Sequence, residues 1–93
     1  MDLKAEAWEL LLNVIRRYGS DIVLQVVLWH LEHFFGITKE NYLDDPEKLL
    51  KAIDEIYGSA SKLLINEWCL ELQDLGVLCN KGVLDALYRI SNI

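Results

Sequence analysis

The two histidines come closer to a chemical site than any other residues of the chain. His30 and His33 are three residues apart in a segment whose pattern predicts a helix, so their rings lie on one side and could bind a metal ion together. Zinc sites in proteins need three or four ligands, and the adjacent Glu32 points away from His30. We therefore expect no metal and no other cofactor. We expect His30 to pack in the core with a hydrogen bond and His33 to lie near the surface, and a ligand- or metal-responsive sensor is the alternative.

A phosphotransfer role is a second possible use of the histidines. The phosphorylated histidine of such a module must be accessible to solvent, a condition that His33, on the flank of its helix, meets better than His30. The basic neighbours that would support a phosphate group are absent nearby. We therefore rank phosphotransfer below protein interaction.

The cysteines do not form a recognisable metal or redox motif. Cys69 and Cys79 match neither the CxxC nor the zinc-ribbon spacing. Cys69 falls on an apolar helical face, where inert packing is the common role, and Cys79 lies in a connector that could expose it. A disulfide between them would require suitable geometry. The default expectation for such cysteines is a reduced, cytoplasmic protein. No Ser/His/Asp order, phosphate-binding glycine loop, EF-hand or HExxH pattern occurs either. We therefore do not expect this chain to be an enzyme.

Composition narrows the classes of partner. The 93 residues carry fifteen acids and nine bases, a net charge of -6, whereas nucleic-acid binders need a basic face. An acidic surface also disfavours anionic membranes. The longest apolar run has four residues, Val26 to Trp29, against about 20 for a membrane span, and the N-terminus lacks the pattern of a signal peptide. We expect a protein partner, with neither nucleic acid nor membrane.

Glycines and one proline divide the chain into helical segments. Apolar residues recur at helical spacing between these breaks, with capping residues at several starts. The sequence predicts an all-α fold, a compact bundle of about five helices in one domain over residues 1–93. The expected helices are 2–18, 21–35, 46–57, 59–75 and 82–91.

The segment from Asp21 to Phe35 is the most apolar of these helices. Ten of its fifteen residues are apolar, and its polar stripe consists of Asp21, Gln25 and Glu32. A valine-rich middle also fits a buried strand, but the length and the spacing of the polar residues favour a helix. A helix with so narrow a polar stripe is either central in its domain or shared with a partner. We expect it to be the central packing element.

Three exposed apolar residues are candidates for an interface. Trp29 lies about 80° from Asp21 on the helical wheel, at the edge of the polar stripe, whereas Trp8 and Trp68 are expected in the core. Leu63 and Leu70 lie seven residues apart on an otherwise polar helical face. With 53% apolar residues, the chain has more apolar surface than one small core hides. We expect a homo-oligomer that self-associates through apolar helix faces.

A helix-turn-helix is the least favoured alternative. It would use residues 46–57, the Gly58-Ser59 turn and a recognition helix over residues 60–68. The exposed groups of that helix would be acidic on balance, which opposes DNA binding. They are Lys62, Asn66, Glu67 and Glu71.

The stretch from Tyr18 to Leu72 resembles a known family. It carries, in order, an aromatic-His-Leu-Glu element, a Phe-Gly-Ile turn, an Asp-Pro-Glu-Lys helix start and an Ile-Tyr-Gly turn. These are Trp29 to Glu32, Phe35 to Ile37, Asp45 to Lys48 and Ile56 to Gly58. The pattern is similar to the fifth class of the Nitrosopumilus output domain, a family of small archaeal helical domains of unknown function. The resemblance implies a signalling-output or interaction module, and it assigns no catalytic or ligand residues.

Overall fold

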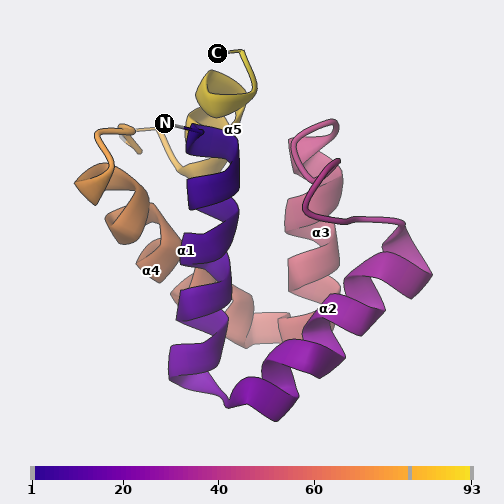
Figure 1. The fold of residues 1–93 in the computed structure, drawn as a ribbon. Coiled ribbons are helices and arrows are strands. Elements are labelled where there is room, and N and C mark those ends of the chain that lie inside the picture. The colour runs from indigo at the N-terminus through magenta and orange to yellow at the C-terminus, as the bar shows by residue number, and fades with distance from the viewer. Residues whose placement is uncertain (1, 80, 93) are drawn as a thin grey trace.

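The computed structural model describes residues 2–79 and 81–92, and within them every regular element is a helix (Figure 1). The all-α prediction is confirmed, and the valine-rich segment is a helix rather than a strand. The α-helices are α1 (Leu3–Tyr18), α2 (Asp21–Phe35), α3 (Pro46–Tyr57), α4 (Ser61–Asp74) and α5 (Val83–Ser91), and a short 3-10 helix, η1 (Gly58–Ala60), lies between α3 and α4.

Side-chain caps fix where the first three helices begin. The carboxylate of Asp2 accepts a hydrogen bond from the backbone N–H of Ala5 at the start of α1. The Ser20 hydroxyl and the Asp45 carboxylate do the same for α2 and α3, each at 3.2 Å. These bonds satisfy backbone donors that have no partner inside the helix, and the three predicted starts agree with them to within one residue.

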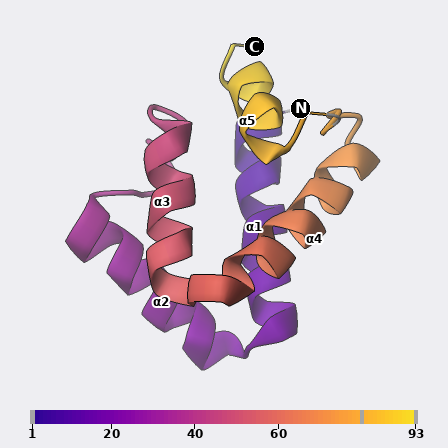
Figure 2. The ribbon, with the colours of Figure 1, turned by 180° about the vertical axis from the view of Figure 1, so that it is seen from behind.

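The junction between α3 and α4 differs from the prediction. The sequence predicts two helices, 46–57 and 59–75, that are separated at Gly58. The chain instead stays helical from residue 46 to residue 74, and no described side chain caps α4. Gly58 has φ of 59°, which lets the chain bend there without steric strain (Figure 2). The buried Ser61 hydroxyl donates to the Asp54 carboxylate at 2.8 Å and braces the bend.

The helices form two V-shaped pairs that pack against each other (Figures 1 and 2). One pair is α1 with α2 and the other is α3 with α4; α1 packs on α4, and α2 packs on α3. Helix α5 contacts α1, α3 and α4 and closes one end. In the described part of the chain α2 contacts only α1 and α3, so it lies at the edge of the bundle.

The centre of the core joins α1 to α4. The fully buried indole of Trp68 donates its N–H to the backbone oxygen of Ala7 at 2.9 Å. Trp8 packs on Tyr42 with ring centroids 4.8 Å apart, and the Tyr42 hydroxyl donates to the backbone oxygen of Lys4. Burial of this phenol raises the pKa of Tyr42. The loop after α2 is therefore packed onto the core, with Tyr42 and Leu43 both buried.

A disulfide joins Cys69 on α4 to Cys79 in the connector that leads to α5. Their Cα atoms lie 6.0 Å apart, within the normal range. Cys79 is buried rather than exposed, because the bond and the buried Val77 hold the connector against the bundle. The disulfide that the sequence left open is present, and it conflicts with the expectation of a reduced setting.

Replacing Trp68 by Phe removes both the indole hydrogen bond and part of the core volume. We expect Trp68→Phe to lower the free energy of unfolding by about 2 kcal/mol. Trp29→Phe is the matched control, since its side chain is half exposed, and should change stability by less than about 0.5 kcal/mol. Urea unfolding at low protein concentration measures both, and equal losses would contradict the assigned core.

The disulfide should contribute stability by restricting the unfolded chain. Closing a loop between cysteines ten positions apart is worth about 2–3 kcal/mol in the chain-entropy model. We expect the Cys69→Ser/Cys79→Ser double variant to lose about this much, and the reduced wild-type chain to match it. Urea unfolding with and without a thiol reductant tests this, and an unchanged midpoint after verified reduction would contradict it.

Candidate functional site

Helix α2 has one face that is packed inside the domain. Leu24, Val27 and Leu31 are buried, at positions that repeat every three to four residues and turn toward α1 and α3. Gly36, with φ of 65°, ends the helix, and its N–H bonds to the backbone oxygen of Glu32 at 3.1 Å. Leu28 and Phe35 are half-buried against the same core, so this inner side holds α2 in place with half of its ten apolar side chains.

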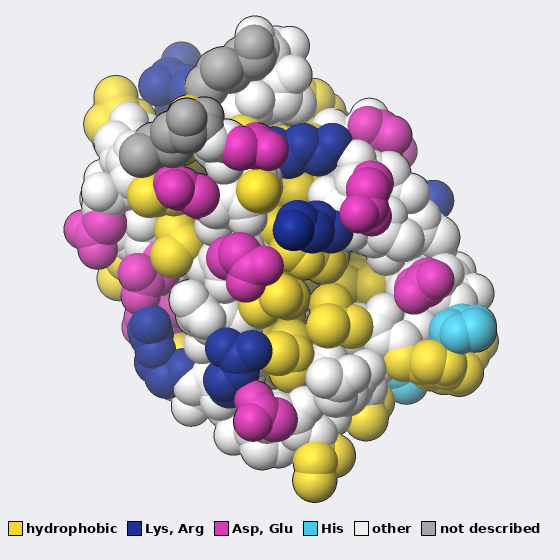
Figure 3. Space-filling model, in the orientation of Figure 1, with side chains coloured by type: hydrophobic (Ala, Val, Ile, Leu, Met, Phe, Trp, Pro, Cys, Tyr) yellow, Lys and Arg dark blue, Asp and Glu magenta, His cyan; other side chains and the backbone are white. Residues whose placement is uncertain are grey.

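The other five apolar side chains of α2 face outward. Ile22, Val23, Val26, Trp29 and Phe34 are between 39% and 77% exposed. We call these five, with His30 and His33, the outer face of α2. Side chains of these sizes leave on the order of 500 Å² of apolar surface open, the size of the largest apolar patch on a typical monomer, which is often functional. Figure 3 shows apolar and histidine side chains gathered at the end of α2.

The expectation that α2 is the central packing element is wrong. Two neighbouring helices cover only one side of it, so its apolar circumference exceeds what the domain can bury. The other reading of such a helix, that a partner shares it, therefore stays open. Within residues 2–79 and 81–92 no helix is long and apolar enough to cross a membrane.

Four rings pack together on the outer face. Trp29 lies between the two histidines, with its ring centroid 4.5 Å from that of His33 and 5.4 Å from that of His30. Phe34 packs on Trp29 at 5.6 Å and on His30 at 5.3 Å. The cluster partly fixes the positions of these side chains at the surface, which lowers the entropy cost of using them in a contact.

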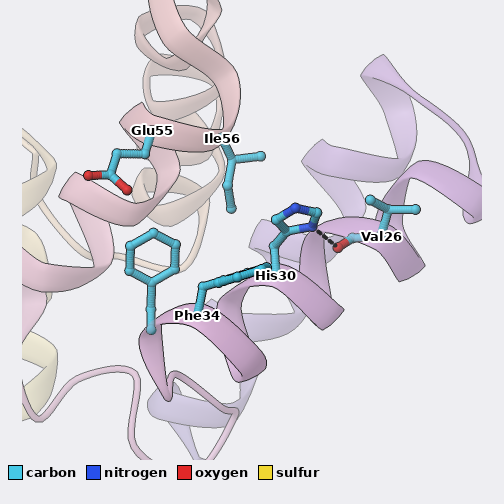
Figure 4. Close-up of a pocket in the computed structure, with 6 residues that line it drawn as sticks. Val26, His30, Phe34, Glu55 and Ile56 are labelled. Atoms are coloured by element: carbon cyan, nitrogen blue, oxygen red, sulfur yellow. Dashed lines mark hydrogen bonds between the residues drawn. The ribbon is translucent and has the colours of Figure 1, made fainter.

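His30 is half-buried rather than part of the core. Its Nδ1 lies 3.1 Å from the backbone oxygen of Val26, one turn earlier in the same helix (Figure 4). Because a carbonyl only accepts, Nδ1 carries the proton of this bond, and in the neutral ring Nε2 is left as an acceptor. The expected hydrogen bond is therefore present, but the ring lies at the edge of the domain because α3 covers only one side of it. His33 is exposed, as expected.

A groove of about 670 Å³ runs between α2 and α3, beside His30. Its walls are mostly apolar, and Glu55 and Ile56 of α3 lie across from the α2 side chains (Figure 4). The lining residues are Val26, His30, Phe34, Phe35, Glu55 and Ile56. Sequence reasoning missed Glu55 and Phe35, because no spacing in the chain indicates that α3 lies beside the end of α2.

Other chemistry finds little support in the described residues. No group of three or more His, Cys, Asp or Glu side chains among them is placed to hold a metal ion. Cys69 and Cys79 are bonded to each other and so offer no thiolate. The neighbours of the histidine rings are the aromatic side chains of Trp29 and Phe34.

The two interface candidates on α4 are exposed, but charged side chains lie beside them. Leu63 and Leu70 are 53% and 58% exposed, as predicted. Arg17 of α1 pairs with two acids of α4 near them, with Glu71 at 2.7 Å and with Glu67 at 3.6 Å. The hydrogen bond to Glu71 raises the pKa of Arg17. These ion pairs place charged groups beside the two leucines. They also mean that the acids of the hypothetical recognition helix pair with α1.

Adjacent valines of α2 provide a matched test of its two faces. Val26 is 50% exposed and Val27 is 3% exposed. We expect Val27→Ser to lower the free energy of unfolding by about 2–3 kcal/mol, because it leaves a cavity and buries a hydroxyl. Val26→Ser should cost less than about 0.5 kcal/mol in dilute solution. Urea unfolding compares them, and a larger loss at Val26 would contradict the orientation of α2.

Comparison with known proteins adds no relative to this description. No protein-family model, no curated protein and no solved structure matches the chain. The resemblance of residues 18–72 to the Nitrosopumilus output domain therefore stays a prediction.

Proposed function

We propose that this chain is a non-enzymatic protein-interaction module that forms a homodimer through the outer face of α2. The observation that carries the proposal is the continuous row of large apolar side chains on a helix that the domain covers on one side only. Exposed apolar surface of this extent favours association, because burying it removes it from water.

The spacing of the outer face suits a second helix. Ile22, Val26, Trp29 and His33 follow one another at steps of four, three and four residues. This is the spacing of the seam through which two helices pack side by side in coiled coils. Gln25, which is exposed, and Glu32 border the seam on one side and would form a polar rim.

A second copy of the chain is the partner that this face fits best. A two-fold interface brings the same patch of both copies together, so any charge on it would meet a like charge. The outer face contains no Lys, Arg, Asp or Glu, although the chain carries a net charge of -6. About 500 Å² of apolar surface with a polar rim also approaches the roughly 800 Å² that each partner buries in a standard interface.

The setting of the module is part of the proposal. Its resemblance to an output domain supports a role downstream of a signalling partner. The Cys69–Cys79 disulfide favours an oxidising compartment over the cytoplasm, because disulfides persist where thiols are not kept reduced. We therefore place the module in an oxidising environment.

A ligand-responsive sensor is the second candidate. The groove beside His30 has a volume within the range of ligand pockets, and two polar groups, the His30 ring and the Glu55 carboxylate, border it. We rank it second because the groove is continuous with the outer face of α2 through Val26 and His30, so dimer formation would cover it.

Sedimentation velocity over a wide concentration range tests the proposed dimer. We expect the mass to rise toward twice the 10.8 kDa of one chain. Val26→Glu should weaken association at least about tenfold, because it places a charge in an apolar contact. Leu70→Glu, a charge at a similarly exposed apolar position on α4, should leave association unchanged.

Two results would contradict the proposal. A wild-type chain that stays monomeric up to millimolar concentration would exclude self-association as its function. A dimer that Leu70→Glu dissociates and Val26→Glu does not would place the interface on α4 instead.

A further inference from the structure

We infer that in the dimer the Trp29 indole of each copy inserts into the α2–α3 groove of the other copy, with the two α2 helices parallel. This inference rests on the proposed self-association and specifies its contact. The groove is then filled by one side chain of the second copy.

Trp29 differs from the other two tryptophans in being available for a contact. Trp8 and Trp68 are buried in the core, whereas Trp29 is half exposed. The Trp68 indole donates to Ala7, but the Trp29 indole N–H donates to no residue in the described part of the chain. A large apolar ring with an unused donor is the type of side chain that most often dominates an interface.

The groove is complementary to an indole. Its walls include the aromatic rings of Phe34 and Phe35, against which another aromatic ring packs favourably. Nε2 of neutral His30 and the carboxylate of Glu55 are the acceptors that border it, and we assign the N–H to the carboxylate, because hydrogen bonds to charged groups are the stronger ones. Glu55 forms no ion pair with any residue that the structure describes, so its carboxylate is available.

Seam geometry brings Trp29 to the groove of a parallel partner. In a parallel pair of helices a seam side chain enters a hole between four residues of the facing helix. For Trp29 the hole consists of the partner copy's residues 26, 29, 30 and 33. Val26 and His30 of this hole also line the groove, so an indole seated in the hole lies at the edge of the groove (Figure 4). Two-fold symmetry repeats the contact, because each copy supplies one indole and one groove.

Intrinsic fluorescence can follow Trp29 with little interference. Since Trp8 and Trp68 are buried, a spectral change with concentration reports mainly on Trp29. We expect its emission to shift to shorter wavelength and acrylamide quenching to fall as the dimer forms. Trp29→Phe supplies the baseline for the core tryptophans and should associate at least about tenfold more weakly, because it lacks the indole donor and part of the ring.

Variants of the groove test the other half of the contact. Glu55→Ala should weaken association by about tenfold, because it removes an acceptor of a charge-assisted hydrogen bond. Glu55→Gln keeps an acceptor and should have a smaller effect. Glu9→Ala, which removes an exposed acid from α1, is the control and should have no effect. For orientation, Ile22→Cys should form a cross-link between copies on oxidation, since seam residues of parallel helices face themselves.

The outcomes separate this inference from the proposed function. A dimer in which Trp29 remains as quenchable as in the monomer, or in which Glu55→Ala associates as tightly as Glu9→Ala, would overturn the groove contact and leave self-association standing. A dimer in which Ile22→Cys does not cross-link would overturn the parallel arrangement, and the groove contact with it. A chain that never associates would overturn both proposals.

Discussion

A helix that is apolar around most of its circumference needs neighbours on several sides, and α2 has them on one. Among the described helices, only α1 and α3 contact it, and they bury Leu24, Val27 and Leu31. Five further apolar side chains of α2 stay exposed, because the other described helices pack on one another and not on its outer face. This limited coverage of α2 leaves the outer face, the aromatic cluster and the groove at the surface.

The rest of the domain is held together by contacts outside the outer face of α2. The centre of the core joins α1 to α4 through Trp68, and α5 closes one end. The bend at Gly58 and the Cys69–Cys79 disulfide tie α4 to the segments before and after it. Because these contacts do not involve the outer face of α2, substitutions on that face should affect association more than folding. This separation makes the proposed function testable with folded variants.

Local chemistry explains what could be predicted from the sequence. The caps at Ser20 and Asp45 act within one turn of chain, so they located α2 and α3, and helical spacing indicated α1 and the exposure of Trp29. Periodicity shows which residues are apolar but not how many helices surround them, and this is why α2 was expected at the centre. The groove beside Glu55 and the disulfide depend on where distant segments meet. A single sequence does not show that.

The central claim is that the outer face of α2 is where two copies meet. Isotope-filtered NOE spectroscopy on a mixture of labelled and unlabelled chains tests it most directly, because it detects only contacts between copies. The account predicts intermolecular NOEs from the side chains of Ile22, Val26 and Trp29 to α2 of the other copy. Intermolecular NOEs confined to Leu63 and Leu70 would contradict it. The absence of any intermolecular NOE at a concentration at which the chain is dimeric would contradict it as well.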